Sequence, residues 1–402
     1  MDIFLAFILV TIILNIMEGM SGTWRTFRFL NRPVLPGAQQ YGPEGLDGSF
    51  GPADTWPPVS ILKPVKGLDP EAASNFESFY TQDYPGRLEM VVASEDREDP
   101  ALEVIRAVAR AHPEIPTRFV RSAPGTGRNG KVANLLAALE EARYEHLLLS
   151  DADTRVAPDF LCKIMAPLSS PEVGASFAIP YISRAAVLPA ALFALFVNVT
   201  ATVAIISGGP VPFAGSHNIL AGAAVATTRN NLQRAGGLEN IEGFIAEDLK
   251  LGELIAGAGL ALRPVSAPVE SPLTSASWSE VWDVFTRWFT ALMKMRPWLY
   301  ALMPLRFAHV HAAVYGILAR GQGLSLPLAF LPLAALLLMR VAWAFWVGRY
   351  LFRDRATARW SVFMPLADLL VVILWLRPFL TTRVRWRGRQ LVVGKGGSIR
   401  EP

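Results

Sequence analysis

Apolar and charged residues are distributed unevenly along the 402-residue chain. The charged residues crowd between Pro57 and Glu270, whereas both ends are dominated by long apolar runs. Short apolar runs separated by charged segments are typical of a water-exposed domain, and apolar runs of about 20 residues are typical of bilayer spans. The pattern therefore predicts a water-exposed domain flanked by membrane segments.

The first apolar segment runs from Met1 to Met20, with Asp2 and Glu18 as its charged residues. It approaches the roughly 20 residues that span a bilayer. A cleaved secretory signal is the alternative, but the segment lacks a small-residue cleavage site. We expect an uncleaved anchor over residues 1–22. Arginines follow at positions 25, 28 and 32, and by the positive-inside rule they place the next segment in the cytoplasm.

Residues 23–57 are expected to form a linker, because from position 33 the chain is rich in Gly and Pro and lacks apolar periodicity. Residues 299–382 are expected to form a C-terminal transmembrane region. Its strongest spans are Leu324–Val347 and Ser361–Leu380, whereas Leu299–Ala319 is interrupted by one arginine and two histidines. Whether the chain has two, three or four spans stays open, and with it the side of the membrane on which the chain ends.

Charge and cysteine content exclude several classes of protein. Residues 383–402 are expected to be a basic tail whose arginines, like those in Arg349–Arg359, lie against anionic headgroups. Because these arginines lie beside apolar runs and the net charge is only +4, they imply no nucleic-acid partner. Cys162 is the only cysteine, which excludes an intrachain disulfide framework and a cysteine-based metal site.

The middle of the chain alternates between two periodicities. Short aliphatic or β-branched runs predict strands at Val59–Val65, Leu88–Ser94, Thr117–Arg121, His146–Ser150 and Val173–Ile179. Helical spacing with polar or proline starts predicts helices at Pro70–Gln82, Pro100–His112, Val132–Ala142 and Pro158–Leu168. This alternation predicts a doubly wound α/β domain with a mainly parallel sheet. Such sheets bind ligands at the carboxyl ends of their strands, so chemistry is expected just after each strand.

The apolar strand His146–Ser150 is followed by two carboxylates, Asp151 and Asp153. A hard divalent cation, Mn²⁺ or Mg²⁺, prefers oxygen ligands and usually bridges to substrate phosphates. The pair therefore predicts a metal site at the ligand-binding edge of the sheet. The alternative is a turn that caps the following helix.

A glycine-rich segment, Gly125–Lys131, lies between a predicted strand and a predicted helix and has the spacing of a phosphate-binding loop. A nucleotide triphosphatase needs a Ser or Thr hydroxyl at the next position, where Val132 offers none. Two interpretations remain for Lys131: it binds a diphosphate at the helix start, or it is a solvated lysine in a glycine turn.

Two further acidic groups lie at predicted helix starts. In Glu95–Asp99, one carboxylate is a candidate acceptor for the edge of a nucleotide base, and its position favours Asp96 over Asp99. Glu247 and Asp248 open the other helix, where Asp248 is a candidate general base that removes a proton from an attacking alcohol. For both groups the alternative is stabilisation of a helix N-terminus.

Arg287 and Trp288 lie on an amphipathic stretch, Trp278–Trp298, that is rich in Trp and Met. Such a stripe is more often core or membrane interface than a binding site. The planar guanidinium of Arg287 nevertheless suits a diphosphate leaving group. The apolar stretch Val187–Ile206 is expected to be a span, an interfacial helix or a buried helix. Three histidines are interpreted as structural: His217, His309 and His311.

The chain contains, in this order, KPVKGLDP from Lys63, QDYP from Gln82, EDREDPA from Glu95, NGKVANL from Asn129, SDADTRV from Ser150, AGGL from Ala235, IAEDLKLGELIAGAG from Ile245 and TRW from Thr286. This series resembles the ceramide glucosyltransferase family of inverting membrane glycosyltransferases (families 2 and 21). It is also similar to bacterial hopanoid-associated glycosyltransferases. The likeness covers residues 57 to 298 and the flanking membrane segments.

The resemblance implies a nucleotide-sugar-binding domain of the glycosyltransferase A type over residues 58–298, on the cytoplasmic face of a bacterial inner membrane. The implied roles are as follows: Asp96 near the uracil, Asp151 and Asp153 at the metal and diphosphate, Asp248 as the catalytic base, and Lys131, Glu247, Arg287 and Trp288 as further substrate contacts. In the family's (Gln/Arg)-x-x-Arg-Trp motif, the first position is Val284 here.

The expected reaction is a single displacement in which the hydroxyl of a membrane lipid attacks a UDP-sugar with inversion. Ceramide is the expected acceptor, with a hopanoid or diacylglycerol as alternatives. The apolar stretches Val187–Ile206 and Trp278–Met303 would form the acceptor's entrance. A polysaccharide synthase of the same fold, and a sugar-nucleotide-binding protein without turnover, are the competing hypotheses. The sugar and the oligomeric state stay open.

Overall fold

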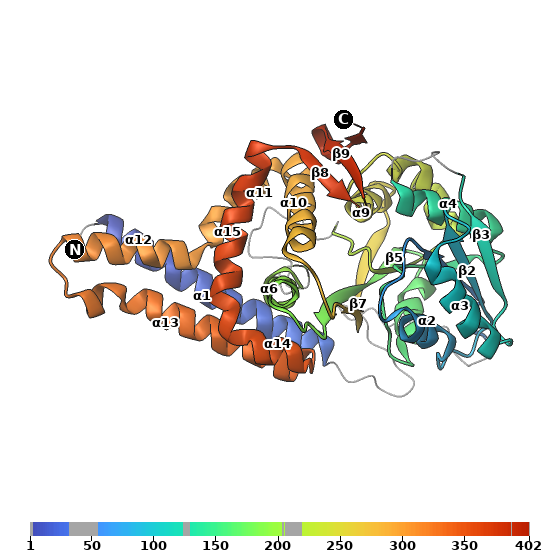
Figure 1. Ribbon diagram of the computed structural model, residues 1–402, viewed down its shortest axis with the longest axis horizontal. Helices are drawn as coiled ribbons and strands as arrows, with labels where there is room; N and C mark the ends of the chain where they lie inside the picture. The colour runs from blue at the N-terminus through green and yellow to red at the C-terminus, as the bar shows by residue number, and fades with distance from the viewer. Residues whose placement is uncertain are drawn as a thin grey trace.

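The computed structural model describes residues 3–31, 55–123, 129–202, 205, 219–386 and 388–401, and shows an α/β domain beside a group of long helices (Figure 1). Most of the expected linker, residues 125–128 of the glycine-rich segment, and His217 lie outside the described residues.

A seven-stranded sheet forms the centre of the α/β domain. Its strands are β1 (Val59–Pro64), β2 (Leu88–Ser94), β3 (Thr117–Arg121), β4 (His146–Ser150), β5 (Val173–Ser183), β6 (Ala224–Thr228) and β7 (Ala261–Pro272), in the order β3-β2-β1-β4-β6-β5-β7. All neighbouring strands are parallel except β6, which is antiparallel to both β4 and β5. The prediction of a mainly parallel sheet is confirmed, with one reversed strand inside it.

Strands β6 and β7 were not among the predicted strands, and their sequences explain why. β6 reads AVATT, which has too little apolar bulk to stand out from a loop. β7 contains Pro264 and Pro268, and proline normally argues against a strand because it cannot donate to the ladder. Here β7 is the edge strand of the sheet and has β5 as its neighbouring strand, and prolines are tolerated at such an edge.

Helices cover both faces of the sheet, because successive strand residues point to opposite sides. In β1, Ile61 packs with α2 (Ala72–Tyr80), α3 (Pro100–Ala111) and α5 (Phe160–Met165). The next residue, Leu62, belongs to the other core, with α4 (Gly130–Glu141), α8 (Arg229–Arg234) and α9 (Glu247–Gly257). Both β1 residues are fully buried, as expected for a strand inside a doubly wound domain.

In the described part of the chain, three helical stretches are long and apolar enough to cross a membrane: Leu5–Leu30, Leu326–Leu351 and Arg355–Leu380. A fourth candidate is bent by 49° between Pro297–Arg306 and Ala308–Gly321, where polar residues interrupt the predicted run. The expected membrane character is confirmed, with three or four spans. Figure 1 shows α1 (Ile3–Leu30), α12 (Ala308–Gly321) and α13 (Leu326–Trp346) side by side, and their apolar side chains form one core.

The expected start of the linker at residue 23 was too early, because α1 continues to Leu30. Thr23, Thr26 and Phe29 extend the buried face of this helix, while Arg25 and Arg28 project outward.

Helix α6 (Leu188–Phe196) is continued by a π-turn to Ala201. For this stretch the sequence left three alternatives: a membrane span, an interfacial helix and a buried helix. α6 is a short buried helix packed against α10 (Trp278–Met295) and α15 (Met364–Leu380).

The expected basic tail was wrong. Residues 383–400 form a second, antiparallel sheet of β8 (Arg383–Trp386), β9 (Arg389–Val393) and β10 (Ile399–Arg400), which packs on α10. Val384, Leu391 and Val393 point inward, while Arg383 and Arg385 of β8 are exposed. This period of two was obscured by the high arginine content, which suggested contacts with headgroups.

Candidate active site

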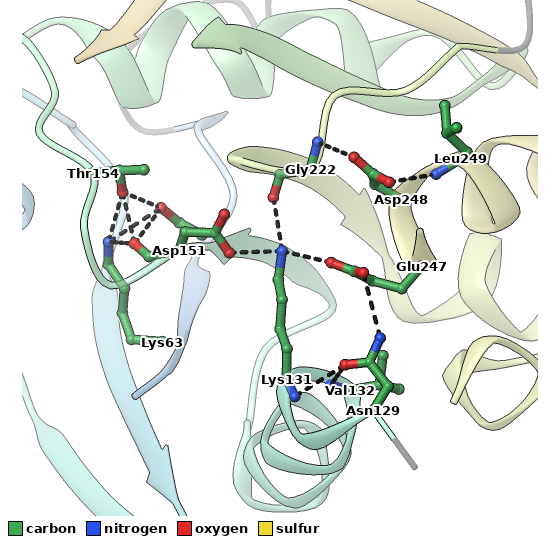
Figure 2. A network of polar contacts seen from close by, with 11 residues as sticks. Lys63, Asn129, Lys131, Val132, Asp151, Thr154, Gly222, Glu247, Asp248 and Leu249 are labelled. Carbon is green, nitrogen blue, oxygen red and sulfur yellow. Dashed lines mark hydrogen bonds and ion pairs between the residues drawn. The ribbon is translucent and has the colours of Figure 1, made fainter. Parts of the chain in front are cut away.

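Charged side chains from four parts of the chain gather at the edge of the sheet where β1 and β4 end (Figure 2). Lys131 lies at their centre, in the first turn of α4. Its Nζ is 2.6 Å from Oδ1 of Asp151 and 2.9 Å from Oε1 of Glu247, and it donates a hydrogen bond to the carbonyl of Gly222 at 3.3 Å. Lys131 is therefore not a solvated lysine, and it joins two acidic groups that were singled out separately in the sequence.

Asn129 builds the helix start that holds Lys131. Its side-chain oxygen accepts hydrogen bonds from the backbone N–H groups of Lys131 and Val132, which caps α4. Its amide nitrogen donates to the carbonyl of Phe244 at 2.9 Å and to Glu247 at 3.4 Å. The same residue thus caps one helix and holds the chain that leads into the next.

The charges in this cluster act strongly on one another. Burial opposes the charge on Lys131, but attraction from Asp151 and Glu247 outweighs it and raises the pKa of the lysine. For Asp151, burial raises the pKa despite the nearby lysine, and Asp153 adds to the shift. For Glu247, the attraction of Lys131 overcomes burial and lowers the pKa, with a further contribution from Arg287. The cluster therefore contains ionised Lys131 and Glu247 beside a less acidic Asp151.

Asp248 is the neighbour of Glu247 at the start of α9. Its Oδ2 accepts a hydrogen bond from the N–H of Gly222 at 3.1 Å, and its Oδ1 accepts one from Leu249 at 2.8 Å. Burial, followed by the negative charge of Glu247, raises the pKa of Asp248 to about 6. A half-buried carboxylate with a pKa close to neutral has the basicity that a general base requires.

Gly222 allows Asp248 to approach the backbone this closely. A Cβ at position 222 would lie 2.7 Å from Cβ of Asp248 and 3.0 Å from its Oδ2, which is closer than such atoms come. The glycine precedes β6, the reversed strand beside β4, so the order of the sheet brings Asp248 near Asp151. Sequence reasoning did not single out Gly222.

Lys63 is a second residue that the sequence reasoning missed. It is fully buried in β1, and its Nζ donates to Oγ of Ser150, the carbonyl of Asp151 and Oγ1 of Thr154, at 3.1, 2.8 and 3.2 Å. The ammonium also lies 3.4 Å from the centroid of the Phe79 ring, and burial lowers its pKa. Lys63 thus fixes the turn that carries Asp151 and Asp153. A lysine within the otherwise apolar strand VSILKP was the available signal.

The turn after β4 offers oxygen ligands of the type that a divalent cation prefers. Asp153 is close enough to Asp151 for its charge to raise the pKa of Asp151. Among the described residues, no group of three or more His, Cys, Asp or Glu side chains is arranged to hold a metal ion. Two carboxylates nevertheless fit a cation that completes its coordination with substrate phosphates and water.

Asp96 and Asp99 have different surroundings, although both belong to the same acidic segment. Asp99 is buried, caps α3 through Ala101 and accepts a hydrogen bond from the N–H of Gly67 at 2.7 Å. Asp96 is exposed just beyond the end of β2, and its Oδ1 accepts a hydrogen bond from the N–H of Glu98. Asp99 therefore has a structural role, while the nucleotide contact of Asp96 stays a prediction.

Arg287 and Trp288 lie on α10, which begins with a capping box formed by Ser277 and Glu280. The charge of Arg287 reaches Glu247, whereas the ring of Trp288 lies 5.3 Å from that of Phe193 on α6. The two neighbours therefore face different parts of the molecule. Arg287 belongs with the charged cluster, and the substrate contact of Trp288 stays a prediction.

Comparisons with known proteins add the following. The model of a family described as glycosyl transferase family 21 matches residues 36–399. Ceramide glucosyltransferase 1 of Caenorhabditis elegans is 27% identical over 259 residues, which are 63% of this chain and 54% of that protein. Ceramide glucosyltransferase 3 of the same organism is 24% identical over 355 residues, 86% of this chain and 75% of that protein. The chain thus spans about half the length of the first relative and three quarters of the second.

Among solved structures, a mannosyltransferase of Pyrobaculum calidifontis, determined in complex with GDP-Man and Mn²⁺, is 20% identical. The alignment has a TM-score of 0.48 and covers 92% of this chain and 98% of that one.

Proposed function

Since the chain belongs to glycosyl transferase family 21, we propose that it transfers a sugar from a UDP-sugar to the hydroxyl group of a membrane lipid, ceramide, with inversion at the anomeric carbon. The observation that carries this proposal is the position of Asp248, a carboxylate with a pKa of about 6 beside the Lys131–Asp151–Glu247 cluster. The relatives named as ceramide glucosyltransferases support the choice of acceptor.

In the proposed mechanism, Asp248 accepts the proton of the lipid hydroxyl as its oxygen attacks the anomeric carbon. The new C–O bond forms while the bond from that carbon to the β-phosphate oxygen breaks, and the electron pair leaves with UDP. Because the attack and departure occur on opposite faces, the configuration inverts and no sugar–enzyme intermediate forms. The hydrogen bonds from Gly222 and Leu249 hold the Asp248 carboxylate in place for this step.

The departing diphosphate is the second requirement. Lys131 and Arg287 supply positive charge near it, and Lys131 can exchange its present carboxylate partners for phosphate oxygens. Asp151 and Asp153 would hold a divalent cation, Mn²⁺ or Mg²⁺, whose charge offsets that of the diphosphate. Lys63 keeps both carboxylates in position through the turn between Ser150 and Thr154.

The acceptor's route is proposed from the packing of the helices. α6 lies buried between α10 and α15, and α10 also carries Arg287, so helices that reach the membrane region adjoin the charged cluster. A lipid that enters along these helices would keep its chains among apolar side chains and present its hydroxyl to Asp248. The arginines that follow the first span favour an active site on the cytoplasmic face of the membrane.

The test uses the full-length protein purified in detergent, with UDP-glucose and ceramide in mixed micelles. We expect one hexose on ceramide, loss of transfer on addition of a chelator, and recovery on addition of Mn²⁺ or Mg²⁺. Parallel reactions with diacylglycerol and a hopanoid identify the acceptor if ceramide is not used. Hydrolysis of the donor with no transfer to any lipid would contradict the proposal, as would a growing polymer.

A further inference from the structure

The small C-terminal sheet contacts three segments of the candidate active site that lie far apart in the sequence. We propose, on the basis of the function proposed above, that this sheet is a positioning element of the donor site, in which Trp386 orients Arg287 and Arg389 holds the loop that carries Asp96. The sheet follows the last membrane span directly, since only Thr381 and Thr382 separate α15 from β8.

The first contact is to the segment that leads into the Glu247–Asp248 pair. The N–H of Ile245 donates to the carbonyl of Gly397 at 3.0 Å, and the N–H of Ile399 donates to the carbonyl of Gly243 at 2.8 Å. Phe244 and Ser398 form an antiparallel bridge between these bonds. The chain just before α9 is therefore fixed by backbone hydrogen bonds to the end of the C-terminal sheet, which limits how far Asp248 can move.

Apolar packing supports the same contact. Ile245 is buried with Val384, Leu391 and Ile399 of the sheet and with Ala291 of α10. Since α10 also carries Arg287, one small core joins the sheet, the start of α9 and the helix of the arginine. The relative positions of Asp248 and Arg287 thus depend on side chains from the last twenty residues of the chain.

The second contact is between Trp386 and Arg287. The guanidinium carbon of Arg287 lies 5.0 Å from the centroid of the Trp386 ring, within the range of a cation–π interaction. Stacking on a flat ring fixes the plane of the guanidinium, and that plane decides which of its N–H groups can reach a diphosphate. The charge of Arg287 also acts on Glu247, so the stacked arginine lies beside the charged cluster.

The third contact is between Arg389 and Glu95. Nη2 of Arg389 donates to both carboxylate oxygens of Glu95, at 2.9 and 3.2 Å. Both side chains are partly exposed, 40% and 30%, so the pair adds little to stability. Its effect is on position, because Glu95 directly precedes Asp96 at the end of β2. Through this pair the sheet contacts the loop that carries Asp96.

The decisive experiment measures UDP affinity, kcat and donor KM for the full-length protein carrying Trp386→Ala. We expect UDP affinity to fall about tenfold, in the range of a partly desolvated cation–π contact. Trp386→Phe, which keeps a ring, should recover most of the loss. In the double variant, Trp386→Ala should add little to the loss of UDP affinity that Arg287→Ala causes, because the tryptophan acts through that arginine. Gln390→Ala, on an exposed position of the same sheet, is the control that should leave all values unchanged.

UDP affinity and kcat/KM within twofold of wild type for Trp386→Ala would overturn the proposal, as would full additivity with Arg287→Ala. If Trp386→Ala does not fold, Arg389→Ala and Glu95→Ala decide, since their partly exposed pair is not needed for folding. Each should weaken UDP binding about threefold, and the double variant should lose no more. Unchanged affinity in both would also overturn the proposal. Absence of UDP binding and transfer in the wild type would instead refute the proposed function.

Discussion

Two clusters of charge, one among the membrane helices and one at the edge of the sheet, are built differently. In the first, Arg340 of α13 donates to both carboxylate oxygens of Asp368 on α15, at 2.9 and 2.6 Å. One cation thus faces one anion, and Arg340 donates a further hydrogen bond to the hydroxyl of Thr200. In the second, Lys131 contacts both Asp151 and Glu247, the charge of Asp153 also acts on Asp151, and the charge of Glu247 acts on Asp248.

The difference shows how a closed ion pair and a reactive cluster can be distinguished. The Arg340–Asp368 pair joins two helices and leaves no unbalanced charge, which is the usual arrangement of ionised groups among membrane helices. The cluster at the sheet edge contains more carboxylates than cations. Burial, followed by the negative charge of Glu247, raises the pKa of Asp248 to about 6, and the cluster suits the binding of a cation and the acceptance of a proton.

Matched Asp→Asn substitutions in the two clusters should have the most different effects on activity. Asp151→Asn removes a proposed metal ligand and the partner of Lys131, and transfer should fall on the order of 10³-fold. Asp368→Asn removes the same charge from the membrane pair and should leave kcat within about threefold. Steady-state transfer to ceramide in mixed micelles measures both. Equal losses of transfer activity in the two variants would show that the two clusters do not differ in their role in the reaction.

Gly222→Ala tests whether the reactive cluster depends on close approach of the backbone. The added methyl group would collide with Asp248, and we expect kcat to fall about 10²-fold with a small change in UDP affinity. Gly257→Ala is the matched control, because Gly257 lies at the end of α9, the helix that begins with Glu247 and Asp248, and a methyl group there meets open space. If Gly222→Ala kept normal kcat, the position of Asp248 would not limit the reaction.

The pH dependence of transfer should report the raised pKa of Asp248, which burial and the negative charge of Glu247 produce. Because the pKa of Asp248 is raised to about 6, kcat should fall about tenfold per pH unit below that value, as the carboxylate becomes protonated. The same shift has a defined sign for stability. The folded state binds this proton more tightly than the unfolded state, so the contribution of Asp248 to stability decreases as pH rises from about 4 to about 6. A pH–rate profile that stays flat down to pH 4.5 would contradict the assignment.

Asp→Asn substitutions should lower stability more in the membrane pair than in the cluster at the sheet edge, which is the reverse of their order for activity. Asp368→Asn leaves Arg340 without its charged partner, and we expect the free energy of unfolding to fall by about 1–2 kcal/mol. Asp248→Asn removes a carboxylate from a cluster that already has an excess, so its melting temperature at pH 8 should equal or exceed that of the wild type. Thermal unfolding in detergent compares the two. A lower melting temperature for Asp248→Asn than for Asp368→Asn would reverse the comparison.

The sequence predicted most of the α/β domain because its periodicity is strong. Strands β2, β3 and β4 begin and end at the predicted residues, since their apolar runs are bounded by charged or turn residues. β7 was missed because its prolines, normally breakers, lie on an edge strand. The C-terminal sheet was missed because its outward arginines resemble a tail beside a membrane span.

The candidate site was predictable only in part. Asp151, Asp153 and Asp248 follow from their position after a strand or at a helix start, and from the resemblance. The contact between Lys131 and Glu247 depends on the order of the strands, which places β6 beside β4. Gly222, which precedes β6, therefore accepts a hydrogen bond from Lys131 and donates one to Asp248. Local sequence contains no information about that order. The same holds for Trp386 and Arg389, which reach the site only through the fold of the last segment.

The most direct test of the central claim is mass spectrometry of lipids from a host that expresses either the wild-type protein or Asp248→Asn. We expect a new lipid, one hexose heavier than ceramide, with the wild type and none with the variant, at equal protein levels. UDP binding by the purified variant should stay close to that of the wild type. The same glycolipid in equal amount from both hosts would contradict the account, because Asp248 could then not be the base.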